Sequence, residues 1–294
     1  MAIKLGGGGG SASQVNEIVY LNDSANTVTL DDGRVYLKGS VFETDPTEYP
    51  DAVFEWKALG PKIFYNGQGG QGRGMTYDGA WLWHVNYASN YVYKYNLSTL
   101  SYASFGINLS SQCTDPGGVA WDGTYLAVVC TGQKYVYKYN TNGNYSNINF
   151  YAGSQDSAPH DIVWDGNHFW VLGNTNKRVY KYNSSGSYQN VSFSVGSEIS
   201  DPRGLAWDGT YFYVTGYVDP TAKMYKYNSS GVFQSATDLP NPTSYATTYE
   251  GLVSIGSDIW AGPNGDPYSI FKLTEASGVT ADSQFGGNNY LRVK

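Results

Sequence analysis

Side chains able to hold a polar ligand recur at matching places along this chain. Arg73, Gly117, His160, Arg203 and Glu250 each stand immediately before an equivalent short apolar segment. Between these segments run loops of variable length and chemistry, expected at 84–87, 131–134, 174–177, 217–220 and 263–266. Loops on a rigid scaffold commonly carry binding residues. Amide, aromatic and a few charged groups suit a carbohydrate, whose hydroxyls need polar partners and whose ring faces pack on aromatic rings. The predicted ligand-binding residues are Arg73, His84, Tyr87, His160, Arg203, Tyr217 and Glu250.

Two alternatives to ligand binding remain open for these positions. The variable loops can be solvated connectors without a ligand. A glycan-cleaving enzyme would need a carboxylate pair among Asp115, Asp201 and Glu250, and sequence spacing does not fix their separation. His84 and His160 are accompanied by neither a Gly-x-Ser-x-Gly motif nor metal-ligand spacing. We therefore predict no catalytic residue, no metal site and no cofactor.

The elements that must position these residues repeat five times. The copies follow one pattern, a Gly-apolar-x-Trp-Asp-Gly segment, an aromatic run and a Tyr-Lys-Tyr-Asn segment, which is clearest at 118–123 with 137–140 and at 204–209 with 225–228. The turn glycines are Gly79, Gly123, Gly166, Gly209 and Gly256, at intervals of 44, 43, 43 and 47 residues. A period in the low forties built of short β-segments is typical of a β-propeller. We predict an all-β fold with five four-stranded blades; six blades is the alternative.

One repeat, residues 204–240, contains the signals for a whole blade. Strands are expected at 204–207, 210–214, 224–227 and from 232, joined by an Asp-Gly turn and an Asn-x-x-Gly turn. The Trp that ends the first strand is expected to pack between blades, and the repeated Asp and Lys are expected to be structural. We expect the face that carries these uniform turns to be featureless, and the opposite face to carry function.

The two ends of the repeat array are expected to meet. The last repeat lacks the Trp-Asp pair, and 62–66 resembles the fourth-strand sequence at 147–151. An N-terminal strand is therefore expected to complete or extend the last blade and so close the ring. Residues 56–294 are assigned to the propeller and residues 1–55 to a separate N-terminal segment.

Composition excludes several classes of protein. Aromatic residues make up 16% of the chain and charged residues 15%, which favours strands over helices. A formal charge of −7 argues against a nucleic-acid partner. Met1–Leu5 runs into five glycines without the apolar core of a signal peptide, and no run of about 18 apolar residues predicts membrane insertion. Cys113 and Cys130 could approach each other, but two buried thiols are the prediction.

The N-terminal segment contains one expected β-hairpin and a family resemblance. Residues 26–30 and 34–37 flank Asp31-Asp32-Gly33 and are predicted to pair. The run from Asp32 to Ser40, then Glu43-Thr44-Asp45 and Tyr49-Pro50-Asp51-Ala52, resembles a segment near the N-termini of tail-fibre and other tail proteins of tailed bacteriophages. The resemblance covers about residues 26–52.

That resemblance implies a tail-fibre or tail-tip protein located in the virion tail and assembled in the host bacterial cytoplasm. Its implied partners are other tail proteins, through the N-terminal segment, and a host-surface glycan or protein, through the propeller. A homo-oligomer or several copies per virion is expected, and a purely structural tail component is the alternative. The predicted attachment residues are Val28, Leu30, Val35, Tyr36 and Leu37.

Overall fold

The computed structural model describes residues 71–217, 222–239, 249–263 and 269–276, together with short strands nearer the two termini. The chain divides into two compact units, Pro61–Leu273 and the combination of Met1–Gly60 with Thr274–Lys294. The predicted boundary at residue 55 lies close to the first division, whereas residues from Thr274 onward group with the N-terminal unit rather than with the propeller. The described residues form strands and turns but no helix, and so none that could cross a membrane.

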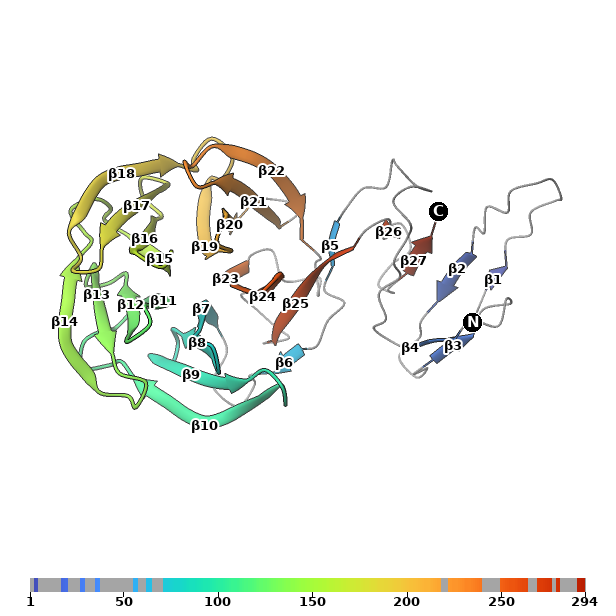
Figure 1. Ribbon diagram of the computed structural model, residues 1–294, viewed down its shortest axis with the longest axis horizontal. Coiled ribbons are helices and arrows are strands. Elements are labelled where there is room, and N and C mark those ends of the chain that lie inside the picture. Colours follow the sequence, from blue (N-terminus) through green and yellow to red (C-terminus); the bar gives the residue numbers. More distant parts are fainter. Residues whose placement is uncertain are drawn as a thin grey trace. The chain divides into compact units, whose positions relative to one another are not determined.

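The larger unit is a β-propeller with five blades, as the repeat predicts (Figure 1). Each of the first four blades is a four-stranded antiparallel sheet in chain order. Their strands are β7 (Gly72–Tyr77), β8 (Leu82–Asn86), β9 (Tyr91–Asn96) and β10 (Ser101–Asn108); β11 (Pro116–Trp121), β12 (Leu126–Cys130), β13 (Tyr135–Tyr139) and β14 (Tyr145–Tyr151); β15 (Pro159–Trp164), β16 (His168–Gly173), β17 (Arg178–Asn183) and β18 (Tyr188–Ser194); β19 (Asp201–Trp207), β20 (Tyr211–Tyr217), β21 (Lys223–Asn228) and β22 (Phe233–Asp238).

The fifth blade joins the two ends of the repeat array. Its first three strands are β23 (Tyr249–Ile255), β24 (Asp258–Pro263) and β25 (Ser269–Ala276). Strand β6 (Lys62–Phe64) pairs antiparallel with β25 through Ser269–Phe271 and supplies the outer strand. The predicted closure by the 62–66 segment is confirmed, and it makes the fifth blade a hybrid of two distant parts of the chain. The alternative of six blades is wrong.

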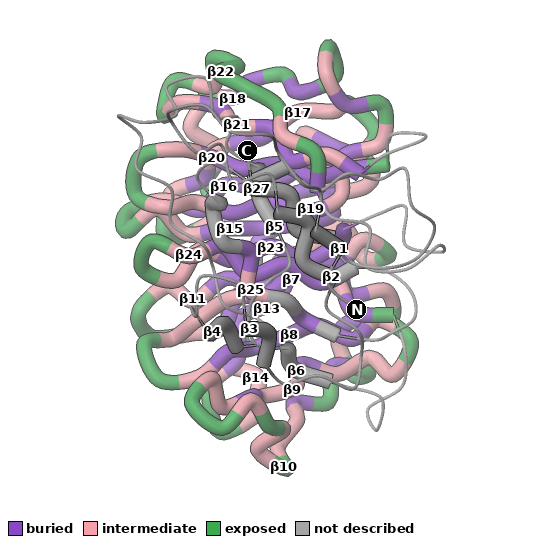
Figure 2. The backbone as a smooth tube through the Cα atoms, turned by 90° about the vertical axis from the view of Figure 1, so that its right-hand side faces the viewer, coloured by how far each residue is buried: buried purple, intermediate pink, exposed green. Residues whose placement is uncertain are grey.

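The inner strands β7, β11, β15, β19 and β23 pack beside one another around the axis, and β23 contacts β7 to complete the ring. Figure 2 shows the buried residues concentrated in the interior and the exposed ones at the turns. Each hydrophobic cluster draws residues from two adjacent blades. The cluster between the third and fourth blades contains Trp170, Phe193 and Phe212, for example, and Trp207 packs against it. The predicted packing of the first-strand Trp between blades is confirmed.

The repeated turn residues are structural, as predicted. In the fourth blade, Asp208 Oδ1 accepts hydrogen bonds from the backbone N–H groups of Thr210 and Tyr211, each at 2.7 Å. Gly209 has a φ of +97°, which is strained for residues with a Cβ. The second carboxylate oxygen of Asp208 accepts from the Tyr213 hydroxyl at 2.9 Å. One short side chain therefore closes the hairpin and satisfies an interior donor.

Four of the five repeated lysines, those of the first four blades, lie against aromatic rings, which supports their predicted structural role. Lys94 Nζ lies 4.1 Å from the centroid of the Trp81 ring, and Lys226 Nζ lies 3.9 Å from that of Tyr211. Lys138 is more deeply buried, and its ammonium group lies 2.8 Å from Asp122 Oδ2.

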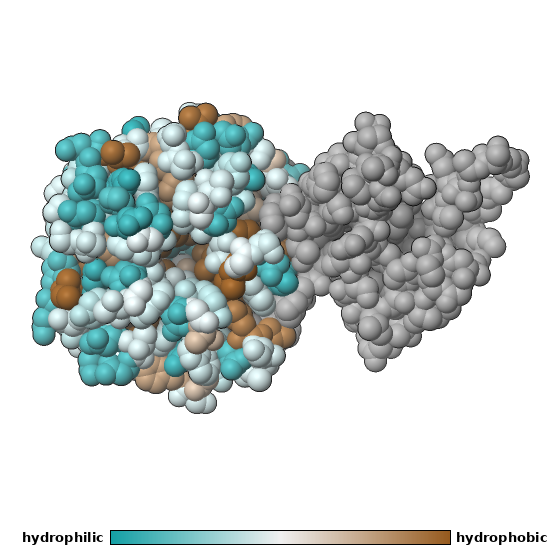
Figure 3. All heavy atoms as spheres, in the orientation of Figure 1, coloured by the Kyte–Doolittle hydropathy of each residue, from teal (hydrophilic) through white to brown (hydrophobic). Residues whose placement is uncertain are grey.

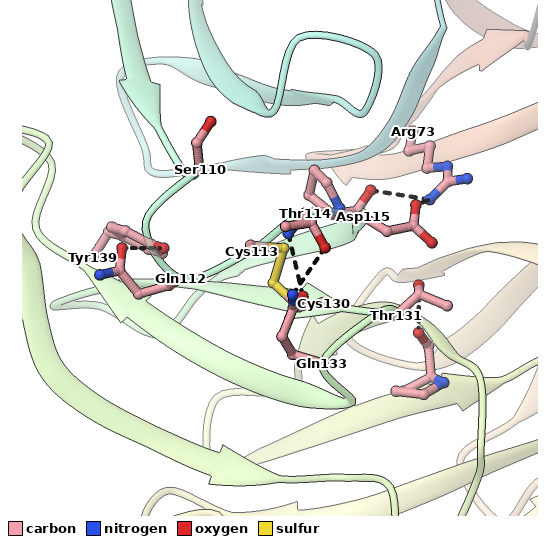
Figure 4. Close-up of a disulfide and its surroundings, with 12 residues drawn as sticks. Arg73, Ser110, Gln112, Cys113, Thr114, Asp115, Cys130, Thr131, Gln133 and Tyr139 are labelled. Atoms are coloured by element: carbon pink, nitrogen blue, oxygen red, sulfur yellow. Dashed lines mark hydrogen bonds and ion pairs between the residues drawn. A yellow bond between two sulfur atoms is a disulfide. The ribbon is translucent and has the colours of Figure 1, made fainter.

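Cys113 and Cys130 form a disulfide (Figure 4), so the prediction of two buried thiols is wrong. The ladder between β11 and β12 pairs Pro116 with Cys130 and so brings the segment before β11 to the end of β12. The resulting Cα–Cα distance of 5.6 Å lies within the range that a disulfide bridges. The order of the segments had indicated that the two cysteines could approach each other. It did not give the distance or the orientation of their side chains.

The described residues of the second unit form short strands. β1 (Ile3–Lys4), β2 (Glu17–Tyr20), β27 (Tyr290–Val293) and β26 (Val279–Thr280) form one sheet, and β5 (Glu55–Lys57) pairs with Thr274–Ala276 of β25. β3 (Thr27–Thr29) pairs antiparallel with β4 (Val35–Leu37), which confirms the predicted hairpin. Leu30 lies outside the described residues, and the attachment role of Val28, Val35, Tyr36 and Leu37 stays a prediction.

Candidate functional site

The candidate site is a network of charged groups at the starts of the inner strands. The inner strands of neighbouring blades pack beside one another around the axis. Residues at the same repeat position near the start of these strands therefore lie close together, and in four blades they are Arg73, His160, Arg203 and Glu250. The second blade has Gly117 at this position and contributes Asp115 instead. We call Arg73, Asp115, His160, Asp201, Arg203 and Glu250 the axial polar network; it has a member in every blade.

Arg73 occupies the junction between the first, second and fifth blades. Its Nη1 atom donates to Asp115 Oδ1 at 2.6 Å and to the carbonyl oxygen of Pro116 at 3.1 Å. Its Nε atom lies 3.3 Å from Glu250 Oε2. The side chain of Arg73 is only 12% exposed and that of Glu250 6%, whereas that of Asp115 is 38% exposed. The arginine therefore holds one carboxylate in the interior and one at the surface.

Arg203 holds the other half of the network. Its Nη2 atom lies 2.7 Å from Asp201 Oδ2, and its Nη1 atom lies 3.8 Å from Glu250 Oε1. Asn174 donates a further hydrogen bond to Asp201. The side chains of Arg203 and Asp201 are 28% and 32% exposed. The ion pairs thus run from Asp115 through Arg73, Glu250 and Arg203 to Asp201, and both ends of this chain are solvent-accessible carboxylates.

His160 is a buried member of the network. It is 4% exposed, and its Nδ1 atom lies 2.9 Å from the carbonyl oxygen of Arg203. Since that oxygen only accepts, Nδ1 carries the proton, and Nε2 accepts from Arg203 Nη1 at 3.3 Å. Burial, and then the charges of Arg73 and Arg203, lower the pKa of His160 to about 3. This histidine is neutral at physiological pH and serves to orient Arg203.

The two acids next to His160 differ in their ionisation. Burial alone would raise the pKa of Asp201, but hydrogen bonds from Arg203 and Asn174 lower it below its usual value. Asp201 is therefore an anion across the physiological range. Burial raises the pKa of Asp161 well above the ordinary value, despite hydrogen bonds from the backbone N–H groups of Ile162 and Leu205.

Asp161 was not among the predicted site residues. It takes the repeat position that glycine occupies in the other four blades, at Gly74, Gly118, Gly204 and Gly251. A Cβ at Gly118 would lie 1.7 Å from Asp161 Oδ1, and one at Gly74 would lie 2.4 Å from it. One acid therefore fills the space that neighbouring glycines leave, beside the network. Four of the five repeats have glycine at this position and one has Asp161. This exception was the sequence signal that could have identified the residue.

Two predicted tyrosines flank the exposed carboxylates. The Arg73 guanidinium carbon lies 4.0 Å from the centroid of the Tyr87 ring. Tyr217 pairs directly with Asp201 in the ladder between β19 and β20, which puts both side chains on the same face of the sheet. Tyr217 is 42% exposed. Residues 218–220, which follow it in the predicted loop, lie outside the described residues.

The prediction that His84 belongs to a variable loop is wrong. It lies within β8 and is 1% exposed, because that strand continues through Asn86 before the loop begins at Tyr87. Burial lowers the pKa of His84 to about 3, so this side chain is a neutral part of the interior. Six of the seven predicted residues thus lie in or beside the axial polar network, and His84 does not.

Comparison with known proteins identifies the fold and nothing finer. No protein-family model and no curated protein matches the sequence. Among solved structures, the glutaminyl cyclase of Myxococcus xanthus is similar with a TM-score of 0.60 and 8% identity, over 77% of this chain and 97% of that one. The virginiamycin B lyase of Staphylococcus aureus is 15% identical, over 90% of this chain and 93% of that one, with a TM-score of 0.46. Among the described residues, no three His, Cys, Asp or Glu side chains are grouped as a metal site would require.

Proposed function

We propose that this protein is a tail-fibre or tail-tip protein of a tailed bacteriophage whose propeller binds a host-surface glycan at the axial polar network. The observation that carries the binding role is the pair of exposed carboxylates, Asp115 and Asp201, each held by an arginine. Because Arg73 and Arg203 fix these carboxylates before a ligand arrives, little side-chain entropy is lost on binding.

A glycan suits this surface better than an apolar ligand. Carboxylate oxygens accept hydrogen bonds from sugar hydroxyls, and the partly exposed guanidinium group of Arg203 can donate to them. Tyr87 and Tyr217 add aromatic surface beside the charged groups. Figure 3 shows one face of the molecule, on which the propeller carries mainly hydrophilic and intermediate residues with some hydrophobic patches.

The virion assignment is supported by two features of different kinds. The segment from Asp32 to Ala52 resembles tail proteins. The disulfide between Cys113 and Cys130 is typical of proteins that work outside the reducing cytoplasm, as a particle protein does after release. Several copies on one particle would raise the effective concentration, so weak binding at each site is sufficient.

A binding experiment tests the glycan assignment. The full chain is applied to an array of bacterial surface polysaccharides, alongside Asp201→Asn and Asp115→Asn variants. Each variant should bind the recognised glycan at least about tenfold more weakly, because a charge-assisted hydrogen bond contributes about 1.5–3 kcal/mol. The control is Asp238→Asn, which makes the same substitution at a carboxylate on the outer strand β22. Equal binding by all four proteins would reject the axial site.

A separate experiment tests the virion assignment. Mass spectrometry of purified phage particles should find the chain, and antibody labelling should place it on the tail. Particles that contain the protein but adsorb normally when both aspartates are replaced would favour the purely structural role. Release of reducing ends from a bound polysaccharide would instead favour a glycan-cleaving enzyme.

A further inference from the structure

Three short segments lead into the inner strands β11, β15 and β19, and we call them the entry segments. They are residues 113–115, 156–158 and 199–201, and each is followed by a proline. The three prolines pair in the ladder with residues at the end of the second strand of the same blade, namely Cys130, Gly173 and Gly216. Each entry segment therefore lies against the end of the second strand of its own blade.

The first residue of the entry segment makes this contact with a different chemistry in each blade. In the second blade Cys113 forms the disulfide with Cys130. In the third blade a Cβ added at Gly173 would lie 2.3 Å from Asp156 Oδ2. In the fourth blade a Cβ added at Gly216 would lie 2.4 Å from Ile199 Cγ2. A covalent bond, a carboxylate and an alkyl group thus occupy equivalent places.

Asp156 is buried and accepts hydrogen bonds from three backbone N–H groups. Its side chain belongs to the interior, with the residue only 2% exposed. Oδ1 accepts from Ala158 at 2.8 Å and from Thr175 at 3.2 Å, and Oδ2 accepts from Asn176 at 2.7 Å. One donor lies in the entry segment and two lie in the loop after β16. Removal of the carboxylate would leave these donors without their acceptor, so Asp156 fixes the loop to the entry segment.

The loop that Asp156 fixes begins with Asn174, which reaches the axial polar network. Asn174 Nδ2 donates to Asp201 Oδ1 and, at 2.9 Å, to the carbonyl oxygen of Pro202. The other carboxylate oxygen of Asp201 accepts from Arg203 at 2.7 Å. Asn174 and Arg203 therefore hold one oxygen each, and the orientation of the Asp201 carboxylate depends on both.

The second blade supports the other exposed carboxylate in an equivalent way. Asp115 and Asp201 are both third residues of an entry segment, and Ala158 takes that position in the blade between them. The backbone N–H of Thr131 donates to the carbonyl oxygen of Asp115 at 2.9 Å, as that of Asn174 does to Ala158 at 3.0 Å. Figure 4 shows Asp115 beside the disulfide and directed toward Arg73.

We propose that Asp156 is a positioning residue of the ligand site: it holds the loop after β16 so that Asn174 keeps the Asp201 carboxylate oriented toward the ligand. The inference rests on the proposed glycan binding at the axial polar network. Asp156 acts through the loop backbone and the Asn174 amide, and it does for Asp201 what the disulfide does for Asp115.

A double-mutant cycle on glycan affinity tests this path. Asp156→Ala should weaken binding of the recognised glycan about fivefold, the effect of losing one hydrogen bond. The same substitution should cause no further loss in the Asn174→Ala background and its full loss in the Asp115→Asn background. An equal loss in all backgrounds, or no loss, would overturn the proposal, because a purely structural role predicts additive effects.

Two further variants keep the test decisive if Asp156→Ala does not fold. Asp156→Asn keeps one acceptor oxygen and should show the same coupling to Asn174→Ala. Asp156→Cys with Gly173→Cys copies the contact of the second blade. Once oxidised, this double variant should bind within about twofold of the unmodified protein. Folded, oxidised protein that binds as weakly as Asp156→Asn would count against the positioning role.

A readout without ligand separates this inference from the glycan proposal. In NMR spectra of the full chain, Asp156→Asn should shift the side-chain amide signals of Asn174 and leave those of Gln133, in the equivalent loop of the second blade, in place. Unmoved Asn174 signals would overturn the positioning role whether or not a glycan binds. Shifted signals in a protein that binds no glycan would reject the proposed function alone.

Discussion

The Glu250 carboxylate lies 3.3 Å from Nε of Arg73 and thereby joins the last blade of the propeller to the first. The same junction is made at the periphery by β6, which pairs with β25. Ring closure is therefore secured by an ion pair at the axis and by a strand at the rim. The ion pair also holds Arg73 in the position from which it binds Asp115.

Glu250→Gln should lower the free energy of unfolding by about 3 kcal/mol, because it removes the one buried carboxylate that faces both Arg73 and Arg203. Chemical denaturation followed by intrinsic fluorescence measures the change. The matched control is Asp238→Asn, which breaks the exposed pair with Lys223 and should cost at most about 1 kcal/mol. Similar losses in the two variants would contradict a special role for the axial pair.

Gly118→Ala should be among the most damaging single-methyl additions in the propeller. The new Cβ would lie 1.7 Å from Asp161 Oδ1 and 2.8 Å from the Cα atom of Asp161, so a change of side-chain rotamer cannot relieve the contact. We expect failure to fold, or a loss of about 3 kcal/mol or more. Gly132→Ala is the control, since its nearest contact is 3.3 Å from a threonine hydroxyl. Thermal melts with equal midpoints would refute the expected close packing at the axis.

Acid should destabilise the propeller through its buried histidines. The pKa values of His84 and His160 fall to about 3 in the folded protein, against about 6.5 for an unfolded histidine. Between these values the unfolded chain binds more protons, so stability falls as the pH falls. The contribution is fully present above pH 6.5 and changes by about 1.4 kcal/mol per pH unit for each histidine.

His160→Gln should therefore flatten the dependence of the unfolding free energy on pH between about 6.5 and 3. Denaturant titrations at several pH values measure the slope. His168→Gln is the control, because the His168 side chain is 31% exposed and its Nδ1 atom lies 3.8 Å from Asp165 Oδ1. A slope that His160→Gln leaves unchanged would show that this histidine is not buried in its neutral form.

Loss of the disulfide should lower stability by about 3 kcal/mol, the value expected for a cross-link that closes a loop of this length, with the cysteines 17 residues apart. For a unit of this size the melting temperature should fall by about 6–12 °C. The measurement compares thermal melts with and without reductant. A Cys113→Ala/Cys130→Ala protein should melt at the lower temperature whether or not reductant is present.

Reduction should also weaken binding at the axial site. Cys113 lies two residues before Asp115, and the disulfide ties that segment to the end of β12 (Figure 4). Gln133 donates a hydrogen bond to Thr114 at 2.8 Å in the same region. If glycan binding proves insensitive to reduction while stability falls, the disulfide contributes to folding but not to the position of Asp115.

Much of the fold could be predicted because its signals are local. The Asp-Gly turn at Asp208 closes its hairpin with groups within three residues, and Gly209 supplies the positive φ there. The closing strand at 62–64 was also predictable, since it shares a sequence pattern with other outer strands. The end of a strand is less well marked: nothing local separates His84 from the loop that begins three residues later.

By itself, the sequence predicted five blades with six as the alternative, the strands of a representative repeat and the repeat position that carries the polar residues. Only the tertiary structure decided which of those residues meet. Arg73 and Glu250 are separated by most of the propeller sequence and become neighbours when the ring closes. The buried acid Asp161 and the Cys113–Cys130 disulfide have the same origin. Each depends on distances between segments that the backbone brings together, and those distances are a property of packing rather than of local pattern.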